Sequence, residues 1–198
     1  QKAMSGKPGP VYLDFPGDLL YDKIAEGEVD WSLSGRPLLG ARPMGEQARI
    51  DALVAALLRA RQPIVLSGSG VLWSQAWEER RAFVEKAGIP FYTTPQGRGV
   101  LPDDHALSYL TMRSTAFRDA DLILVVGTRM NYIIGHAAPP RFGAKATIAR
   151  IDIDADEIAS SPRKVDIGIV GDCKMVLAQL LEAMGSRVDA DRFAPWRK

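Results

Sequence analysis

The segment at residues 121–127 (Asp-Leu-Ile-Leu-Val-Val-Gly) constrains the fold of this chain more than any other part of its sequence. Its five central residues are all apolar and are bounded by an aspartate and a glycine, which is typical of a short strand. A strand with one solvated face alternates apolar and polar residues, whereas a strand covered on both faces is a continuous apolar run. The segment therefore predicts a strand inside a parallel sheet.

Helical and extended patterns alternate on both sides of this strand, from residue 46 to residue 185. This alternation predicts an α/β fold, with a doubly wound, mostly parallel sheet and helices on both faces. The apolar residues Ile50, Leu53, Val54, Leu57 and Leu58 recur at helical spacing. Further strands are expected at 64–66, 89–92, 147–153 and 165–170, and further helices at 74–87, at 111–119 and after Asp172.

The flanking residues are expected to lie outside this sheet. Residues 11–15 (Val-Tyr-Leu-Asp-Phe) have the pattern of a short strand without a partner strand nearby. Residues 17–45 hold several glycines and prolines without a sustained period and are interpreted as a linker, and residues 187–198 as a polar tail. Because the chain starts at Gln1 and not at an initiator methionine, we expect it to be a fragment of a longer protein.

Composition excludes several classes of function. Twenty-five Lys and Arg residues balance 24 Asp and Glu residues, so the chain lacks the basic excess of a nucleic-acid-binding protein. A single cysteine, Cys173, excludes an internal disulfide framework and a multi-cysteine zinc site. It fits a reducing compartment, and we expect a cytoplasmic location. No apolar run reaches about 18 residues, so no membrane-spanning helix and no membrane partner are expected.

Candidate binding residues follow the predicted strands, because ligands of parallel sheets bind at the carboxyl ends of the strands. The first strand leads into Gly68-Ser69-Gly70, where small residues and free helix amides suit a phosphate. Residues 121–127 lead into Arg129, a bidentate ligand for phosphate. Asp152, Asp154 and Asp156 follow a third strand, where a carboxylate commonly accepts hydrogen bonds from a ribose. Asp172 and Cys173 close the last strand.

Each of these features also has a purely structural interpretation. The glycines are equally compatible with a plain tight turn, since a third glycine of the dinucleotide motif is missing. Arg129 is compatible with a surface ion pair, and Asp154 and Asp172 with N-caps of the following helices. His105 and His136 are too few and too far apart for a metal cluster, and Cys173 has no adjacent histidine. We therefore expect no metal site and no catalytic residue in this chain.

Several phrases resemble one enzyme superfamily, in the right order and along nearly the whole chain. Residues 9–18 (Gly-Pro-Val-Tyr-Leu-Asp-Phe-Pro-Gly-Asp) resemble the phrase that ends the pyrimidine-binding domain of thiamine-diphosphate-dependent enzymes. Residues 88–90, 93–102, 120–129, 151–154 and 171–172 resemble their Rossmann-like central domain. The resemblance implies that residues 1–16 end a pyrimidine-binding domain, that 46–186 form the central domain, and that 187–198 lead toward a diphosphate-binding domain.

Residues 129–132 (Arg-Met-Asn-Tyr) and 139–142 (Pro-Pro-Arg-Phe) resemble 2-hydroxyacyl-CoA lyase and its relative oxalyl-CoA decarboxylase. In that branch the central domain holds ADP, and the complete enzyme joins or cleaves an aldehyde or ketone and a formyl-CoA unit. The resemblance implies a homo-oligomer, a dimer or a tetramer, of an enzyme that uses an acyl-CoA substrate. It places Lys7, the turn Gly68-Ser69-Gly70, Arg129, Asp154, Asp172 and Cys173 around ADP, and Arg113 toward CoA.

Thiamine diphosphate and Mg²⁺ are implied for the complete enzyme only. The Gly-Asp-Gly phrase of the diphosphate-binding domain, followed by an asparagine, is missing from this chain, as is the glutamate that activates the thiazolium. We therefore expect the chain alone to bind no thiamine diphosphate. Three alternatives stay open: an acetolactate-synthase-like enzyme with FAD, oxalyl-CoA decarboxylase, in which a lysine often replaces Ser69, and a nucleotide-free structural spacer.

Overall fold

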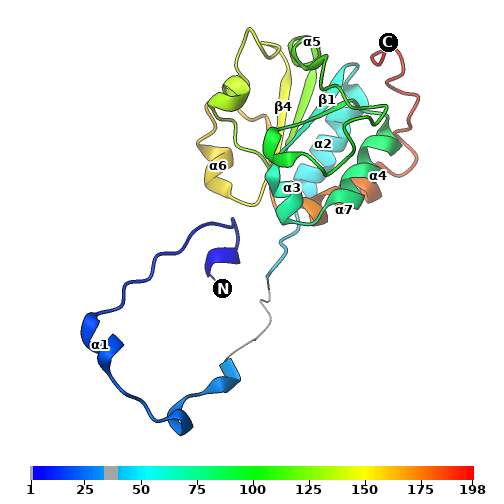
Figure 1. Cartoon of the computed structure of the whole chain (residues 1–198). Helices are drawn as coiled ribbons and strands as arrows, with labels where there is room; N and C mark the ends of the chain where they lie inside the picture. Colours follow the sequence, from blue (N-terminus) through cyan, green and yellow to red (C-terminus); the bar gives the residue numbers. More distant parts are fainter. Residues whose placement is uncertain (1, 34–39) are drawn as a thin grey trace. The chain divides into compact units, whose positions relative to one another are not determined.

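The structure of the chain is a computed structural model that describes residues 2–33 and 40–198 (Figure 1). Its backbone divides into two compact units, residues 1–41 and residues 42–198. All strands formed by the described residues belong to the second unit.

A five-stranded parallel sheet forms the centre of the second unit. Neighbouring strands follow the order β2-β1-β3-β4-β5, and every neighbouring pair is parallel, which confirms the predicted doubly wound sheet (Figure 1). The chain moves from β1 outward to β2 and then returns to β3 on the other side of β1. A reversal of this kind creates a crevice at the carboxyl ends of the two strands where it occurs. The strands are β1 (Pro63–Ser67), β2 (Phe91–Thr93), β3 (Leu122–Val126), β4 (Thr147–Asp152) and β5 (Ile167–Val170).

Strand β3 is covered on both faces, as its continuous apolar sequence predicts. Leu122, Leu124 and Val126 belong to one core cluster, whereas Ile123 and Val125 belong to the other. Successive side chains of a strand point to opposite faces of the sheet, so each face receives every second residue. The two clusters are therefore the cores of two layers packed on either side of the sheet.

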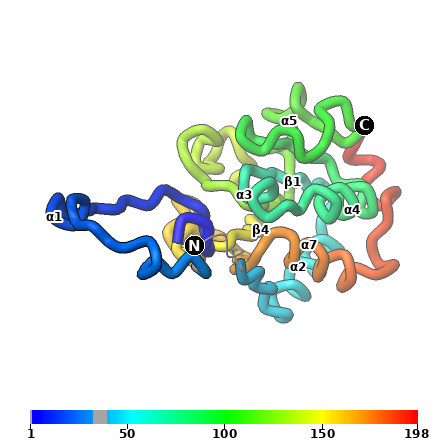
Figure 2. The backbone as a smooth tube through the Cα atoms, turned by 60° about the horizontal axis from the view of Figure 1, so that its bottom comes forward, coloured from blue at the N-terminus to red at the C-terminus, as the bar shows by residue number. Residues whose placement is uncertain are grey.

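The first layer contains α2 (Gln47–Arg59), α4 (Trp77–Ala87) and α7 (Cys173–Met184), which lie together in Figure 2. The second layer contains α5 (Arg113–Asp119) and the 3-10 segment η5 (Tyr132–Ala137). The short helix α6 (Ala155–Ala159) follows β4. Helices on both faces of the sheet complete the predicted architecture.

The helix expected at residues 74–87 begins three residues later, as α4, and a separate short helix, α3 (Ser69–Trp73), precedes it. The Ser74 hydroxyl donates to the Gly70 carbonyl at 2.8 Å, and Gln75 adopts a left-handed backbone with φ of 55°. A left-handed residue cannot continue a right-handed helix, so the chain turns before α4 begins.

The residues interpreted as a polar tail pack on the second unit. Val188 and Phe193 are buried in the first core layer. The Trp196 indole donates to the Pro63 carbonyl at 2.8 Å, and the Arg197 guanidinium donates to the Gly88 carbonyl at 3.1 Å. Near the N-terminal limit of the unit in sequence, the backbone amide and carbonyl of Gly45 form hydrogen bonds with the side chain of Gln179. The predicted domain boundaries at 45/46 and 186/187 remain predictions, but both flanks contribute to this unit.

The first unit consists of short helices with exposed apolar residues. These helices are η1 (Lys2–Met4), α1 (Gly17–Tyr21), η2 (Glu26–Glu28) and η3 (Trp31–Leu33). Residues 11–15 form no strand, because no described segment of this unit offers them a ladder of hydrogen bonds. Their apolar side chains are at least half exposed. Residues 34–39 of the expected linker lie outside the described residues.

Candidate functional site

The turns that follow β1 and β3 cross at the carboxyl edge of the sheet. The Gly68 amide donates to the Val126 carbonyl at 3.0 Å, and the Gly70 amide donates to the Gly127 carbonyl at 2.9 Å. A Cβ atom on Gly68 would lie 2.8 Å from the Gly127 oxygen, and one on Gly70 would lie 2.6 Å from the Gly127 Cα. The glycines are therefore explained by the close approach of the two turns, and both of their amides are already used within the protein.

A third turn lies against this crossing. The 3-10 segment η4 (Pro95–Gly97) follows β2, and the Thr94 amide donates to the Ser67 carbonyl at 2.9 Å. A Cβ atom on Gly97 would lie 2.9 Å from the Gly68 Cα. The carboxyl ends of β1, β2 and β3 are thus joined through backbone contacts, which leaves Ser69, half-buried at the start of α3, as the polar side chain of the turn Gly68-Ser69-Gly70.

Arg129 lies next to this crossing in a chain of alternating charges. Its side chain is 62% exposed, and its Nε atom lies 2.9 Å from the Glu157 carboxylate. Glu157 also pairs with the buried Arg150 at 3.3 Å, and Arg150 pairs with Asp152 at 2.9 Å. The surface ion pair considered for Arg129 is therefore present, and its guanidinium remains accessible to solvent.

The three acidic residues after β4 have different environments. Asp154 is the N-cap of α6 and accepts a hydrogen bond from the Asp156 amide at 3.0 Å. Asp152, the last residue of β4, is buried and accepts from the Asp154 amide at 3.1 Å. Burial raises the pKa of Asp152, while the Asp154 amide and Arg150 act in the opposite direction. Sequence reasoning selected Asp154 alone and missed that Asp152 anchors this turn, although its place at the end of the strand was the available signal.

Asp172 occupies the N-terminus of α7. Its carboxylate accepts from the Lys174 amide at 3.0 Å and from the Met175 amide at 3.3 Å, and it pairs with Arg42 at 3.4 Å. Two of the helix amides proposed for a phosphate are therefore occupied by this cap, which is the structural interpretation of Asp172.

Cys173, the first residue of α7, is enclosed beside the crossing of the turns. Its Sγ atom lies 3.0 Å from the position that a Cβ atom on Gly127 would occupy. Burial raises the pKa of the thiol to about 12. The thiol is therefore protonated near neutral pH, and a protonated thiol is a poor nucleophile.

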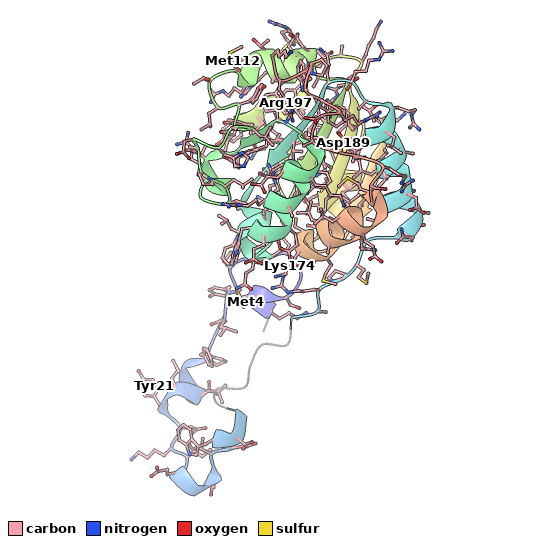
Figure 3. All side chains as sticks on the ribbon, turned by 90° about the vertical axis from the view of Figure 1, so that its right-hand side faces the viewer. Met4, Tyr21, Met112, Lys174, Asp189 and Arg197 are labelled. Carbon is pink, nitrogen blue, oxygen red and sulfur yellow. The ribbon has the colours of Figure 1, made fainter. Side chains whose placement is uncertain are left out.

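Arg113 and Lys7 belong to other elements than the turns that follow β1, β3, β4 and β5 at the carboxyl edge of the sheet. Arg113 begins α5, and its guanidinium donates to the Tyr92 hydroxyl at 3.4 Å and lies 5.7 Å from the Tyr92 ring. Figure 3 shows Met112, the preceding residue, and Lys174, in the first turn of α7, at opposite ends of the second unit. Lys7 belongs to the first unit, so its role remains a prediction.

Residues 2–33 and 40–198 contain no cluster of three or more His, Cys, Asp or Glu side chains arranged to hold a metal ion. None of their helices is long and apolar enough to cross a membrane.

Residues 50–180 match the family model described as the central domain of thiamine pyrophosphate enzymes, and the chain belongs to this family. It is 37% identical to a 2-hydroxyacyl-CoA lyase of Arabidopsis thaliana in an alignment of 186 residues that covers 90% of this chain and 32% of that protein. It is 30% identical to oxalyl-CoA decarboxylase of Escherichia coli K12, covering 98% of this chain and 34% of that protein. The chain thus spans about a third of the length of these relatives.

Solved structures show the same fold. The crystal structure of benzoylformate decarboxylase from Polynucleobacter necessarius superimposes with a TM-score of 0.72 and 23% identity, covering 94% of this chain and 34% of that one. A putative thiamin diphosphate-dependent enzyme from Mycobacterium smegmatis superimposes with a TM-score of 0.64 and 22% identity, covering 79% and 30%. At these identities the likeness establishes the fold alone.

Proposed function

We propose that the chain is the central domain of a thiamine-diphosphate-dependent lyase that cleaves 2-hydroxyacyl-CoA into an aldehyde or ketone and formyl-CoA. The observation that carries this proposal is the similarity to 2-hydroxyacyl-CoA lyases along about nine tenths of the chain, at 37% identity for Arabidopsis thaliana and 33% for Mus musculus. The complete enzyme would be a homo-oligomer, a dimer or a tetramer. The single cysteine supports a reducing compartment such as the cytoplasm.

Three alternatives have support of their own. Oxalyl-CoA decarboxylase is favoured by the match to the Escherichia coli protein, which covers nearly the whole chain. An acetolactate-synthase-like enzyme with FAD is favoured by a probable acetolactate synthase large subunit of Methanocaldococcus jannaschii, 35% identical over 92% of this chain. A nucleotide-free spacer is the third alternative, because the Gly68 and Gly70 amides are already used.

The carboxyl edge of the sheet would hold ADP in the lyase. The accessible guanidinium of Arg129 suits the diphosphate, provided that it turns away from Glu157. Asp154 suits the ribose hydroxyls, because this half-buried residue lies in the turn that follows β4. Ser69 would add a hydroxyl. The amides of Gly68 and Gly70 contribute none of the contacts, and Asp172 and Cys173 would line the site without offering free helix amides.

Thiamine diphosphate and Mg²⁺ would be held by the remaining domains of the complete enzyme, where the cofactor supplies the carbanion chemistry of the reaction. Arg129 and Asp154, at the carboxyl edge of the sheet, would contact the nucleotide and not the thiamine diphosphate. Arg113, at the start of α5 in the second layer, would pair with a phosphate of CoA, and Tyr92 would keep its guanidinium in place.

A thermal-shift titration of the 198-residue chain tests the nucleotide site. A ligand that binds only the folded state stabilises it by about 2.7 kcal/mol at a hundredfold excess over Kd. ADP is expected to raise the melting temperature, and Asp154→Asn should remove most of the shift. Asparagine is as good an N-cap as aspartate, so the ligand-free melting temperature should stay unchanged. Asp156→Asn, two residues away and exposed, is the matched control.

The alternatives predict different results in the same titration. A shift with FAD and none with ADP would replace the lyase by the synthase-like enzyme. A shift with neither nucleotide would favour the spacer. An equal response of the Asp154→Asn and Asp156→Asn variants would show that Asp154 does not contact the nucleotide.

A further inference from the structure

Arg80, in the first turn of α4, is a fully buried cation. Its exposed fraction is 0%, and its Nε and Nη1 atoms have no hydrogen-bond partner among the described residues. Its Nη2 atom lies 3.4 Å from the Ser67 hydroxyl, and the centre of its guanidinium lies 4.8 Å from the centroid of the Phe91 ring. The side chain therefore reaches from α4 to the last residue of β1 and the first residue of β2.

No acidic side chain of the described residues forms an ion pair with Arg80. Its neighbour Glu79 points to α7, where one carboxylate oxygen pairs with Lys174 at 3.4 Å and the other is buried without a partner. Burial lowers the pKa of Arg80 to about 9, so the guanidinium remains protonated at neutral pH. The second unit thus keeps an unpaired positive charge in its interior.

Such a charge is costly for folding. Isolated buried ions lose several kcal/mol of solvation, and their replacement by apolar residues of similar volume is often neutral or stabilising. The aromatic face of Phe91 recovers part of this loss through a cation–π contact. The remaining cost is typical of residues that serve a site and not the stability of the fold.

The position of the charge indicates which site it serves. Ser67, its hydrogen-bond partner, immediately precedes the turn Gly68-Ser69-Gly70, where the turns after β1 and β3 cross. A charge in a medium of low polarity acts over a longer distance than the same charge in water. The field of Arg80 therefore reaches the carboxyl edge of the sheet from beneath the turn.

We propose that Arg80 is a positioning residue that makes the carboxyl edge at β1 selective for anionic ligands, through its field and not through contact. For the identity of the anion, the inference rests on the proposed nucleotide site: the diphosphate of a nucleotide gains from this field, whereas an uncharged nucleoside does not. Arg129 would contact the diphosphate from the solvent side, and Arg80 would act from the protein side.

The variant Arg80→Met separates this role from a structural one. It should leave the melting temperature unchanged or raise it, and it should weaken ADP binding about tenfold, as expected for one charge acting across a partly polar medium. Binding of adenosine, which lacks the diphosphate, should be unaffected. Arg80→Lys, which retains the charge, should recover part of the affinity. Arg81→Met is the matched control, because Arg81 is the exposed neighbour on the same helix.

A second measurement reads the field without any nucleotide. In the variant Ser69→Cys, the pH profile of thiol alkylation reports the local potential, since a nearby positive charge lowers a thiol pKa. Adding Arg80→Met should move this profile to higher pH by about half a unit or more. Adding Arg81→Met should not. The native Cys173 is buried and protonated, so it contributes little signal.

The outcomes distinguish the two hypotheses. If the wild-type chain binds no ADP, the proposed nucleotide site fails, and the alkylation profile alone decides on Arg80. If the profile does not move, the proposal for Arg80 is wrong whatever the nucleotide does. Equal losses of ADP and adenosine binding, or a large fall in melting temperature with Arg80→Met, would make Arg80 a structural residue.

Discussion

Among single residues, Arg113 gives a direct test of the proposed substrate class. It is exposed at the start of α5 and is held by Tyr92 through a hydrogen bond and the face of its ring. A charge-assisted hydrogen bond to a phosphate contributes about 1.5–3 kcal/mol. In the complete enzyme, Arg113→Ala should therefore raise KM for acyl-CoA roughly tenfold to a hundredfold, measured by steady-state kinetics.

The matched control is Arg118→Ala, on the same helix, because Arg118 is exposed and already paired with Asp119 at 2.8 Å. Its KM for acyl-CoA should equal that of the wild type. If the two variants behave alike, Arg113 makes no contact with CoA.

Among the elements, the crossing of the turns after β1 and β3 is closely packed. A methyl group on Gly70 would lie 2.6 Å from the Gly127 Cα, and neither backbone can move without breaking the hydrogen bond between the two turns. Overpacking of this kind costs about 1–3 kcal/mol. Gly70→Ala should thus lower the melting temperature by several degrees in calorimetry. Gly27→Ala, at a position with open space, should leave it unchanged, and equal values for both variants would contradict the close packing.

In the whole molecule, residues 187–198 behave as part of the second unit. Phe193 is 1% exposed in the core layer formed by α2, α4 and α7. Truncation of a buried phenylalanine to alanine costs about 3–5 kcal/mol. Phe193→Ala should therefore lower the free energy of unfolding by about this amount in urea titrations. Lys198→Ala, at an exposed position, is the control, and an unchanged Phe193→Ala protein would show that the segment is a true linker.

The amino-acid sequence is sufficient to predict the fold class, because burial on both faces leaves a local pattern: the run from Leu122 to Val126 has no polar position, and the helices repeat their apolar residues at fixed spacing. It also located most of the turns that carry the candidate site, since the carboxyl ends of parallel strands share one edge. The family could also be predicted from the sequence, because its motifs are short and contiguous.

Which residues are available at that edge depends on contacts that form when the chain folds. Whether the Gly68 amide is free depends on the Val126 carbonyl, which is distant in sequence. Whether Asp172 caps α7 depends on the local backbone geometry, which the same residues can adopt or not. The burial of Arg80 and of Phe193 was equally hidden, because both lie in segments whose charged and polar composition is typical of a surface. Local patterns report how a segment is solvated on average, whereas the environment of one side chain is set by the neighbours that the fold brings to it.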